Sequence, residues 1–182
     1  TLGFDRREEK QREFNQGYEE LIRIAREHIS TLTFGSTDTD VNVWAVHPNC
    51  DKIDNGSKPK EIRRLLNAVK GHDGKFRAIL VSDAIDYILA DCNLAGEDLF
   101  EGVVLTQYNK GVPLEESDLM CFSGSRKNLV GGCYIGMCLD VFVENLIEHG
   151  FKEVKVKKRW SHNPKPIYNR IYPYLPYTLK II

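Results

Sequence analysis

The segment "SGSRKNLVGGCYIGMCLDVFVENLIEHGFKEVKV", residues 123–156, carries the strongest pattern in this chain of 182 residues. A short apolar strand over 118–124 is expected to lead into it, and a long amphipathic helix is expected to begin at Gly131 and Gly132. Gly150 followed by Phe151 is typical of a helix end with a left-handed cap. The alternating residues 152–159 then predict a strand. Glycine costs about 1 kcal/mol relative to alanine in a helix, so two glycines at a helix start need an explanation.

The remaining segments alternate between helix and strand patterns. Apolar spacing predicts a helix within 4–32, with residues 1–10 as a frayed extension, and alternation predicts a strand over 41–48. Further strands are expected at 76–83 and 99–113, while 82–94 is compatible with either state. The fold class is therefore α/β in one domain, residues 1–182, a mixed central sheet flanked by helices in an α+β layer. Two short helices are also expected, around 62–69 and 167–172.

Composition limits the classes of function and location. The formal charge of −1 and the pI near 6.5 provide no overall field for nucleic acid, so binding of nucleic acid is not expected. Five cysteines without a C-x-x-C pair indicate a reducing compartment, intracellular, either cytoplasmic or nuclear. His47 and Cys50 have ligand-like spacing, but no second pair completes four ligands, so no metal site is predicted. No apolar run is long enough for a membrane span, and no signal peptide is recognised.

Two glycines at a helix start favour the close approach of an anion. Backbone N–H groups and the helix dipole attract phosphate at that end, and glycine removes the Cβ that would hold a ligand away. Arg126 and Lys127 could add charge, and Asn128 is a candidate N-cap. The alternative is that Gly131 and Gly132 only allow tight packing of the helix.

In its order of strand, glycine turn, long helix and strand, this region resembles the GNAT family of acyl-CoA-dependent N-acyltransferases, with "NLVGGC", residues 128–133, at the family's pyrophosphate turn. The resemblance covers about residues 76–175, and a looser likeness extends to a divergent branch of histone acetyltransferases. It implies a GNAT-like fold and acetyl-CoA, or another acyl-CoA, as cosubstrate. The implied cofactor-binding residues are Leu119, Cys121, Ser123, Arg126, Lys127, Asn128, Gly131, Gly132 and Cys133.

The same resemblance implies acyl transfer to an amine, either a small molecule or a protein lysine. Tyr168 is the expected general acid for the departing thiolate, with Tyr172 second, because the family often has a tyrosine near the sulfur. The base is sought among carboxylates before the predicted strand at 118–124, and Glu116 is the candidate. These roles stand or fall with the acyltransferase interpretation.

Two other functions compete with acyl transfer. Cys133 near a helix start, preceded by Arg126 and Lys127, has surroundings that lower a thiol pKa, which suggests a cysteine hydrolase or deamidase with His162 as partner. A buried, inert cysteine is the plainer account. A non-catalytic interaction domain is the third possibility, in which "KVKKRW", residues 155–160, and the tyrosine-rich tail contact RNA or an acidic peptide.

Overall fold

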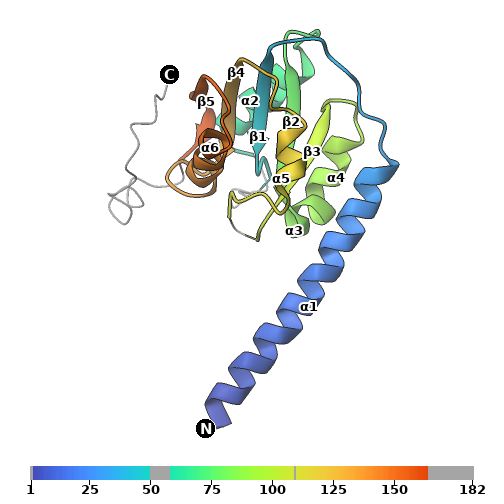
Figure 1. Cartoon of the computed structure of the whole chain (residues 1–182), viewed down its shortest axis with the longest axis vertical. Helices are drawn as coiled ribbons and strands as arrows, with labels where there is room; N and C mark the ends of the chain where they lie inside the picture. Colours follow the sequence, from blue (N-terminus) through green and yellow to red (C-terminus); the bar gives the residue numbers. More distant parts are fainter. Residues whose placement is uncertain (1, 50–57, 109, 164–182) are drawn as a thin grey trace.

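The computed structural model describes the chain except for residues 1, 50–57, 109 and 164–182, and Figure 1 shows its arrangement. Helices and strands alternate along almost the whole described chain. The helical segments are α1 (Leu2–Thr31), α2 (Lys60–Lys70), α3 (Ala84–Asp86), the π-helical η1 (Tyr87–Asp91), α4 (Cys92–Ala95), α5 (Glu116–Met120) and α6 (Cys138–Glu148). The strands are β1 (Val41–Val46), β2 (Arg77–Asp83), β3 (Gly102–Thr106), β4 (Lys127–Cys133) and β5 (Val154–His162).

Within the described residues, the five strands form one sheet in the order β3-β2-β1-β4-β5. Every neighbouring pair is parallel, so the mixed sheet expected from the sequence is corrected to a parallel one. Parallel strands that are covered on both faces read as continuous apolar runs, and the burial of β1 and β2 fits this rule. The α/β class itself is confirmed.

Each face of the sheet has its own hydrophobic core. Val43, Leu80 and Leu105 point to the side covered by α1, α2 and the α3–η1–α4 segment. Trp44 and Val81 point to the opposite side, which α5 and α6 cover in the foreground of Figure 1. The protein is thus a three-layer arrangement of helices, sheet and helices.

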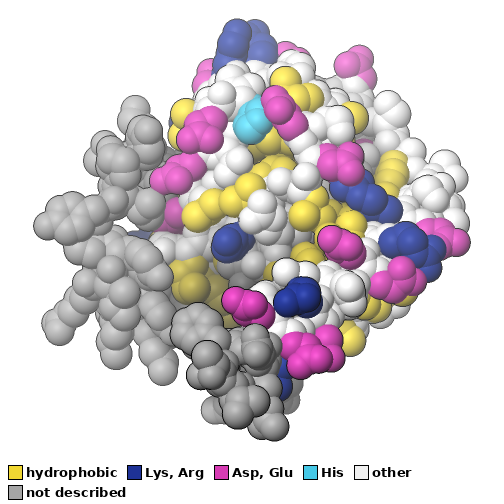
Figure 2. Space-filling model, turned by 60° about the horizontal axis from the view of Figure 1, so that its bottom comes forward, with side chains coloured by type: hydrophobic (Ala, Val, Ile, Leu, Met, Phe, Trp, Pro, Cys, Tyr) yellow, Lys and Arg dark blue, Asp and Glu magenta, His cyan; other side chains and the backbone are white. Residues whose placement is uncertain are grey.

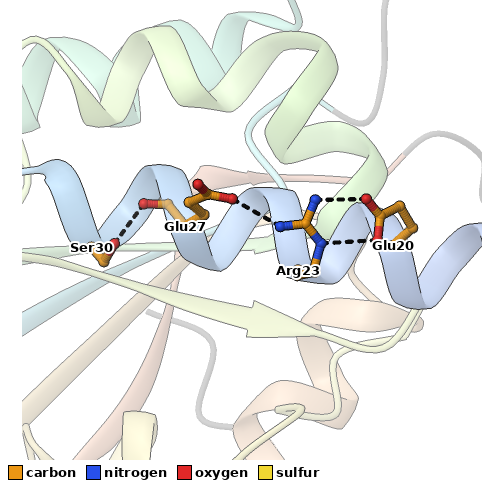
Figure 3. Close-up of polar contacts among 4 residues, drawn as sticks. All are labelled: Glu20, Arg23, Glu27 and Ser30. Carbon is orange, nitrogen blue, oxygen red and sulfur yellow. Dashed lines mark hydrogen bonds and ion pairs between the residues drawn. The ribbon is translucent and has the colours of Figure 1, made fainter.

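Helix α1 extends far beyond the other layers in Figure 1. Its carboxyl half contacts the body, where Ala25 is fully buried and Tyr18 and Leu21 pack on the core. Along its exposed side, Arg23 donates hydrogen bonds to Glu20 and Glu27, as Figure 3 shows. These pairs at helical spacing support the helix but do not hold it to the sheet.

Residues 118–132 fold differently from the expected order of strand, glycine turn and helix. Gly131 and Gly132 lie inside β4 and open no helix, and residues 118–124 form α5 and a turn in place of a strand. The reason is close packing between strands. Gly132 has a φ of 131°, and a Cβ there would overlap the carbonyl oxygen of Val46 in β1. A Cβ at Gly131 would lie 2.7 Å from Cβ of Trp160 in β5.

The expected helix end is confirmed. Gly150 has a φ of 79°, and the Phe151 amide donates to the carbonyl of Leu146 over 3.0 Å. Phe151 is buried in the core on the α6 side. Helix α6 is nevertheless shorter than predicted, because it begins at Cys138, after a turn that follows β4.

Candidate functional site

The strand order contains a switch point at the carboxyl ends of β1 and β4. The chain passes from β1 outward to β2 and β3 on one side, and later places β4 and β5 on the other side. In open parallel sheets, ligands bind outside the carboxyl ends of the strands at such a point. The residues that follow β1 and β4 are therefore the first place to search for a site.

Cys138 lies at this switch point as the first residue of α6. The turn from Tyr134 to Met137 carries it, and the amides of Met137 and Leu139 donate to the carbonyl of Tyr134 over 3.1 and 3.4 Å. Cys138 is buried, with 8% of its surface exposed to solvent. A thiol at the amino end of a helix feels the positive end of the dipole, which lowers its pKa.

Asp140, in the first turn of α6, braces the same turn. Its carboxylate accepts a hydrogen bond from the Gly136 backbone, while burial raises the pKa of Asp140. Within the described residues its Oδ1 atom has no hydrogen-bond partner. A buried carboxylate oxygen without a donor is costly, so this turn retains an unsatisfied acceptor.

A loop after β3 reaches the amino end of α6. The Gln107 amide donates to Val112 over 2.9 Å, and Thr106 bridges to Pro113, so the chain turns back on itself. A Cβ at Gly111 would overlap the carbonyl oxygen of Cys138, so the loop backbone packs directly on that residue. Lys110, the residue before Gly111, is exposed.

His47 follows β1 at the same edge. It adopts a left-handed backbone with a φ of 44°, and its Nε2 lies 3.0 Å from the Thr106 hydroxyl oxygen. Its side chain is almost fully buried. Burial lowers the pKa of His47 to about 4, although the Asp83 carboxylate acts in the opposite direction. His47 is therefore a neutral imidazole at pH 7.

Carboxylates gather beside His47 at the ends of β1 and β2. Asp91 is fully buried and accepts hydrogen bonds from Ser82, over 2.6 Å, and from Asn49. Burial raises the pKa of Asp91 to about 6, and burial together with the Asp83 charge raises the pKa of Asp86 to about 6. Shifted pKa values cluster at functional sites more than elsewhere, which favours this edge as the site.

Figure 2 brings the lower edge of Figure 1, where the strands end, toward the viewer. Hydrophobic side chains lie together at the centre of this view, and acidic and basic side chains surround them. This edge therefore combines apolar surface with charge of both signs. Within the described residues, no group of three or more His, Cys, Asp or Glu side chains is placed to hold a metal ion.

The residues expected to bind acyl-CoA are not brought together. The amides of Arg126 and Lys127 both donate to the Asp40 carbonyl over 3.0 Å at the start of β4, the edge opposite to Cys138. Asn128 is buried in the sheet, where its amide oxygen accepts hydrogen bonds from Asn42 and Trp44. An anion site that joins these residues to a helix start has no counterpart in the structure.

The other expected residues lie around α5 or outside the described chain. Leu119 is the buried residue of α5, while Cys121 is exposed and Ser123 lies in the turn after the helix. Glu116 opens α5 and pairs with His149 over 3.3 Å. Tyr168 and Tyr172 fall outside the described residues.

Cys133 is the last residue of β4 and is fully buried. His162 is indeed its partner in the sheet register, and His162 also lies 3.4 Å from Glu61. The sequence analysis considered His47 only as a metal ligand, and it singled out neither Cys138 nor Gly111 for the site. The available signal was the turn glycine at 136 before an amphipathic segment, since α6 begins at Cys138, seven residues after Gly131.

Comparisons with known proteins find similar structures but no similar family model or curated sequence. No protein-family model matches the chain, and no curated protein sequence is similar enough to match. Among solved structures, YcaC from Pseudomonas aeruginosa, solved with hexane-2,5-diol and covalent acrylamide, matches with a TM-score of 0.51 and 15% identity. That match covers 77% of this chain and 73% of the other.

A second match is the YcaC gene product of Escherichia coli, described as an octameric hydrolase of unknown specificity. Its TM-score is 0.51 at 13% identity, over 83% of this chain and 79% of that chain. A third, described as an isochorismatase hydrolase from Oleispira antarctica, reaches a TM-score of only 0.46 at 13% identity, over 70% of this chain and 78% of the other. The chain therefore shares the fold of the YcaC structures.

These findings overturn the acyltransferase interpretation. The resemblance to GNAT enzymes is wrong, because every neighbouring pair of strands is parallel and the chain shares the fold of the YcaC structures. The acyl-CoA N-acyltransferase activity and acetyl-CoA as cosubstrate lose their support with it. No helix among the described residues is both long and apolar enough to cross a membrane.

Proposed function

We propose that this protein is a hydrolase that uses the thiolate of Cys138 to cleave a small amide or ester. One observation carries the proposal: Cys138 is the first residue of α6 at the switch point, and the Lys110–Gly111 loop packs on its backbone. The thiolate attacks the acyl carbon and forms a thioester, and the amine or alcohol leaves with a proton. Water then cleaves the thioester, which releases the acid and restores the thiol.

The surroundings of Cys138 suit each of these steps. The helix dipole favours the thiolate over the thiol, and we assign the Lys110 cation, one residue before the loop contact at Gly111, to the same role. The positive end of the α6 dipole favours the oxyanion that develops during attack. Neutral His47 and the carboxylates beside it lie at the same edge of the sheet and are our candidates for moving a proton.

The structural neighbours agree with this chemistry. The Escherichia coli protein is described as a hydrolase, and the Pseudomonas protein was solved with covalent acrylamide. Acrylamide is an electrophile that reacts with nucleophiles such as thiolates. A covalent adduct in a protein of this fold supports a reactive nucleophile in that neighbour.

Cys138 fits the nucleophile better than Cys133. Cys133 ends a strand, is fully buried and packs in the core on the α2 side. Cys138 retains some exposure and stands at a helix start, where a nucleophile can meet substrate beside the positive end of the helix dipole. The hydrolase alternative drawn from the sequence is therefore kept, and the nucleophile is moved by five positions.

Alkylation by acrylamide tests this proposal without a known substrate. Intact-mass and peptide mass spectrometry over a pH series should show Cys138 modified fastest, with a midpoint below the ordinary thiol pKa of about 8.5. Lys110→Met should raise that midpoint. Cys121→Ser removes an exposed cysteine and is the matched control that should leave the Cys138 rate unchanged.

A second measurement follows acylation. p-Nitrophenyl acetate should give a burst of nitrophenol and an acetylated Cys138 peptide, and both should disappear in Cys138→Ser. If Cys138 reacts no faster than Cys121, or if the burst survives in Cys138→Ser, the assignment of the nucleophile is overturned.

A further inference from the structure

The edge strand β5 contains a wide bulge that interrupts its pairing with β4. Val130 pairs with Val156 and Gly132 pairs with Ser161, so Gly131 alone faces the four residues 157–160. The Ser161 hydroxyl donates to the Lys157 carbonyl over 2.9 Å and closes the bulge. Bulges re-aim side chains and often lie next to binding sites.

The bulge has the sequence Lys-Lys-Arg-Trp and is anchored on a glycine. Trp160 can lie over the sheet only because residue 131 has no Cβ, since an added Cβ would lie 2.7 Å from that of Trp160. The Lys157 ammonium lies 6.0 Å from the centroid of the Trp160 ring. The indole is thus fixed by the backbone and remains partly exposed.

Helix α2 completes a groove against this bulge. The groove is open to solvent on one side. Helix α2 contributes a cationic and an amide side chain to its lining, and the β5 bulge contributes two cations and the indole. Its lining residues are Arg64, Asn67, Lys157, Arg159 and Trp160. Among these described lining residues, three are positive and none is negative, although the whole chain has a formal charge of −1.

This combination differs from an ordinary solvated charge run. Lysines on an edge strand usually protect it from pairing, and they need neither an aromatic neighbour nor a groove. Here the bulge, the glycine opposite it and helix α2 together fix an aromatic ring beside three cations. Cations on a groove wall bind successive phosphates, and an aromatic face stacks a base without regard to sequence.

We propose that the groove between α2 and the β5 bulge binds single-stranded nucleic acid, with one base stacked on Trp160 and phosphates held by Arg64, Lys157 and Arg159. This inference is independent of the hydrolase proposal, because α2 and β5 line the groove, whereas Cys138 opens α6 on the opposite face of the sheet. It differs from the expectation based on net charge, because it requires only a local cationic patch and no overall field.

Fluorescence anisotropy with fluorescein-labelled oligo(dT) of about ten nucleotides tests the proposal on the full chain. Binding is expected in the micromolar range near 0.1 M salt, and three phosphate contacts predict a slope of log K against log salt of about −2. Trp160→Ala should weaken binding at least about fivefold, and Trp160→Phe should restore most of it. Circular dichroism confirms that each variant is folded.

The cationic wall has a matched control on the same helix. Arg64→Ala should weaken binding and reduce the salt slope by about 0.7, whereas Arg63→Ala, exposed but outside the groove, should change neither. Tryptophan quenching reports on Trp160, because Trp44, the other tryptophan, is fully buried.

Three results would overturn the proposal. They are no binding of the oligonucleotide, equal binding by Trp160→Ala in folded protein, and equal competition by a poly-glutamate peptide of matched charge. The last result would assign the groove to acidic peptides. Thymidine monophosphate should compete only weakly, because a single nucleotide engages one phosphate position.

Discussion

At the amino edge of the sheet, where the strands begin, buried polar side chains form hydrogen bonds with one another. At the carboxyl edge, where the strands end, buried side chains have shifted pKa values, and one oxygen has no hydrogen-bond partner among the described residues. Asn42 and Asn128 share a hydrogen bond of 3.0 Å, and Asn128 also accepts from the Trp44 indole over 3.1 Å. Arg77 and Ser125 both donate to the Asn42 amide oxygen. All of these groups are hydrogen-bonded.

The carboxyl edge contains His47, Asp86 and Asp91, each with a pKa moved by burial, and Asp140, one oxygen of which has no hydrogen-bond partner among the described residues. Burying such groups costs stability, and groups of this kind cluster at functional sites. From this difference we infer that the amino edge stabilises the fold, whereas the carboxyl edge carries the proposed active site. Four predictions test this division.

The largest effect is expected from Asn128→Ala at the amino edge. The change removes the acceptor of the Asn42 amide and of the Trp44 indole, and also the donor to the Lys152 carbonyl, 2.7 Å away. Buried groups left without partners should lower the free energy of unfolding by about 3–5 kcal/mol. Urea denaturation measures the change, and Asn67→Ala on exposed α2 is the matched control that should have little effect.

A loss below about 1 kcal/mol for Asn128→Ala would contradict the division between the two edges, because the amino edge would then contribute little to the free energy of unfolding. The alkylation rate of Cys138 should remain that of the parent protein under conditions in which the variant is folded.

His47→Asn is expected to alter how stability depends on pH. The folded pKa of His47, about 4, lies below its ordinary value of 6.5, so His47 contributes stability near pH 7 that is lost as pH falls toward 4. Asp86 and Asp91, with pKa values raised to about 6, act oppositely and destabilise the protein as pH rises toward 6. In the parent protein these trends offset each other.

Asparagine tolerates the left-handed backbone at position 47 and does not titrate. Between pH 4 and pH 6.5 the variant should therefore lose stability with rising pH, and its profile should differ from the parent by up to about 3 kcal/mol. Urea titrations at several pH values measure the difference. Parallel profiles for the two proteins would show that His47 does not titrate with folding.

Gly111→Ala should act on the proposed site more than on the fold. The added methyl group would overlap the Cys138 carbonyl, so the loop must move away from α6. We expect a loss of about 1–3 kcal/mol and a change of at least several-fold in the alkylation rate of Cys138. Gly124→Ala, where no atom lies within 4 Å of the added Cβ, is the matched control. An unchanged alkylation rate in folded Gly111→Ala would separate the loop from the thiol.

The smallest effect is expected from Arg26→Met, which lies between the two edges. Arg26 ties α1 to α5 through Glu115 at 3.1 Å and Asp118 at 3.2 Å. The pair is partly exposed, so thermal unfolding should show a loss below about 1 kcal/mol that shrinks further at high salt. A loss of several kcal/mol would mean that α1 is as important to the fold as the amino-edge network.

Local patterns in the sequence were sufficient for most of the elements. Apolar periodicity located α1, α2 and the strands β1 and β2, and the Gly150–Phe151 pair located the end of α6. Each of these signals depends on residues close together in the chain. The α/β class followed from their alternation.

The site could not be predicted in the same way. Gly131 and Gly132 carry the same local signal in a helix start and in a strand that packs closely, and only the neighbours Val46 and Trp160 distinguish the two. The contact between Gly111 and Cys138 likewise joins segments distant in sequence. Its existence depends on the order of strands, which brings the loop after β3 over the start of α6.

By itself, then, the sequence determined most of the elements and the α/β class, because hydrophobic periodicity and capping act over a few residues. It did not determine the state of residues 118–124 or the start of α6. Only the tertiary structure decided that the sheet is parallel, that Cys138 opens α6 at the switch point, and that His47 and Asp91 are buried beside it. Strand order and burial are set by the packing of the whole chain, and the pKa shifts follow from that packing.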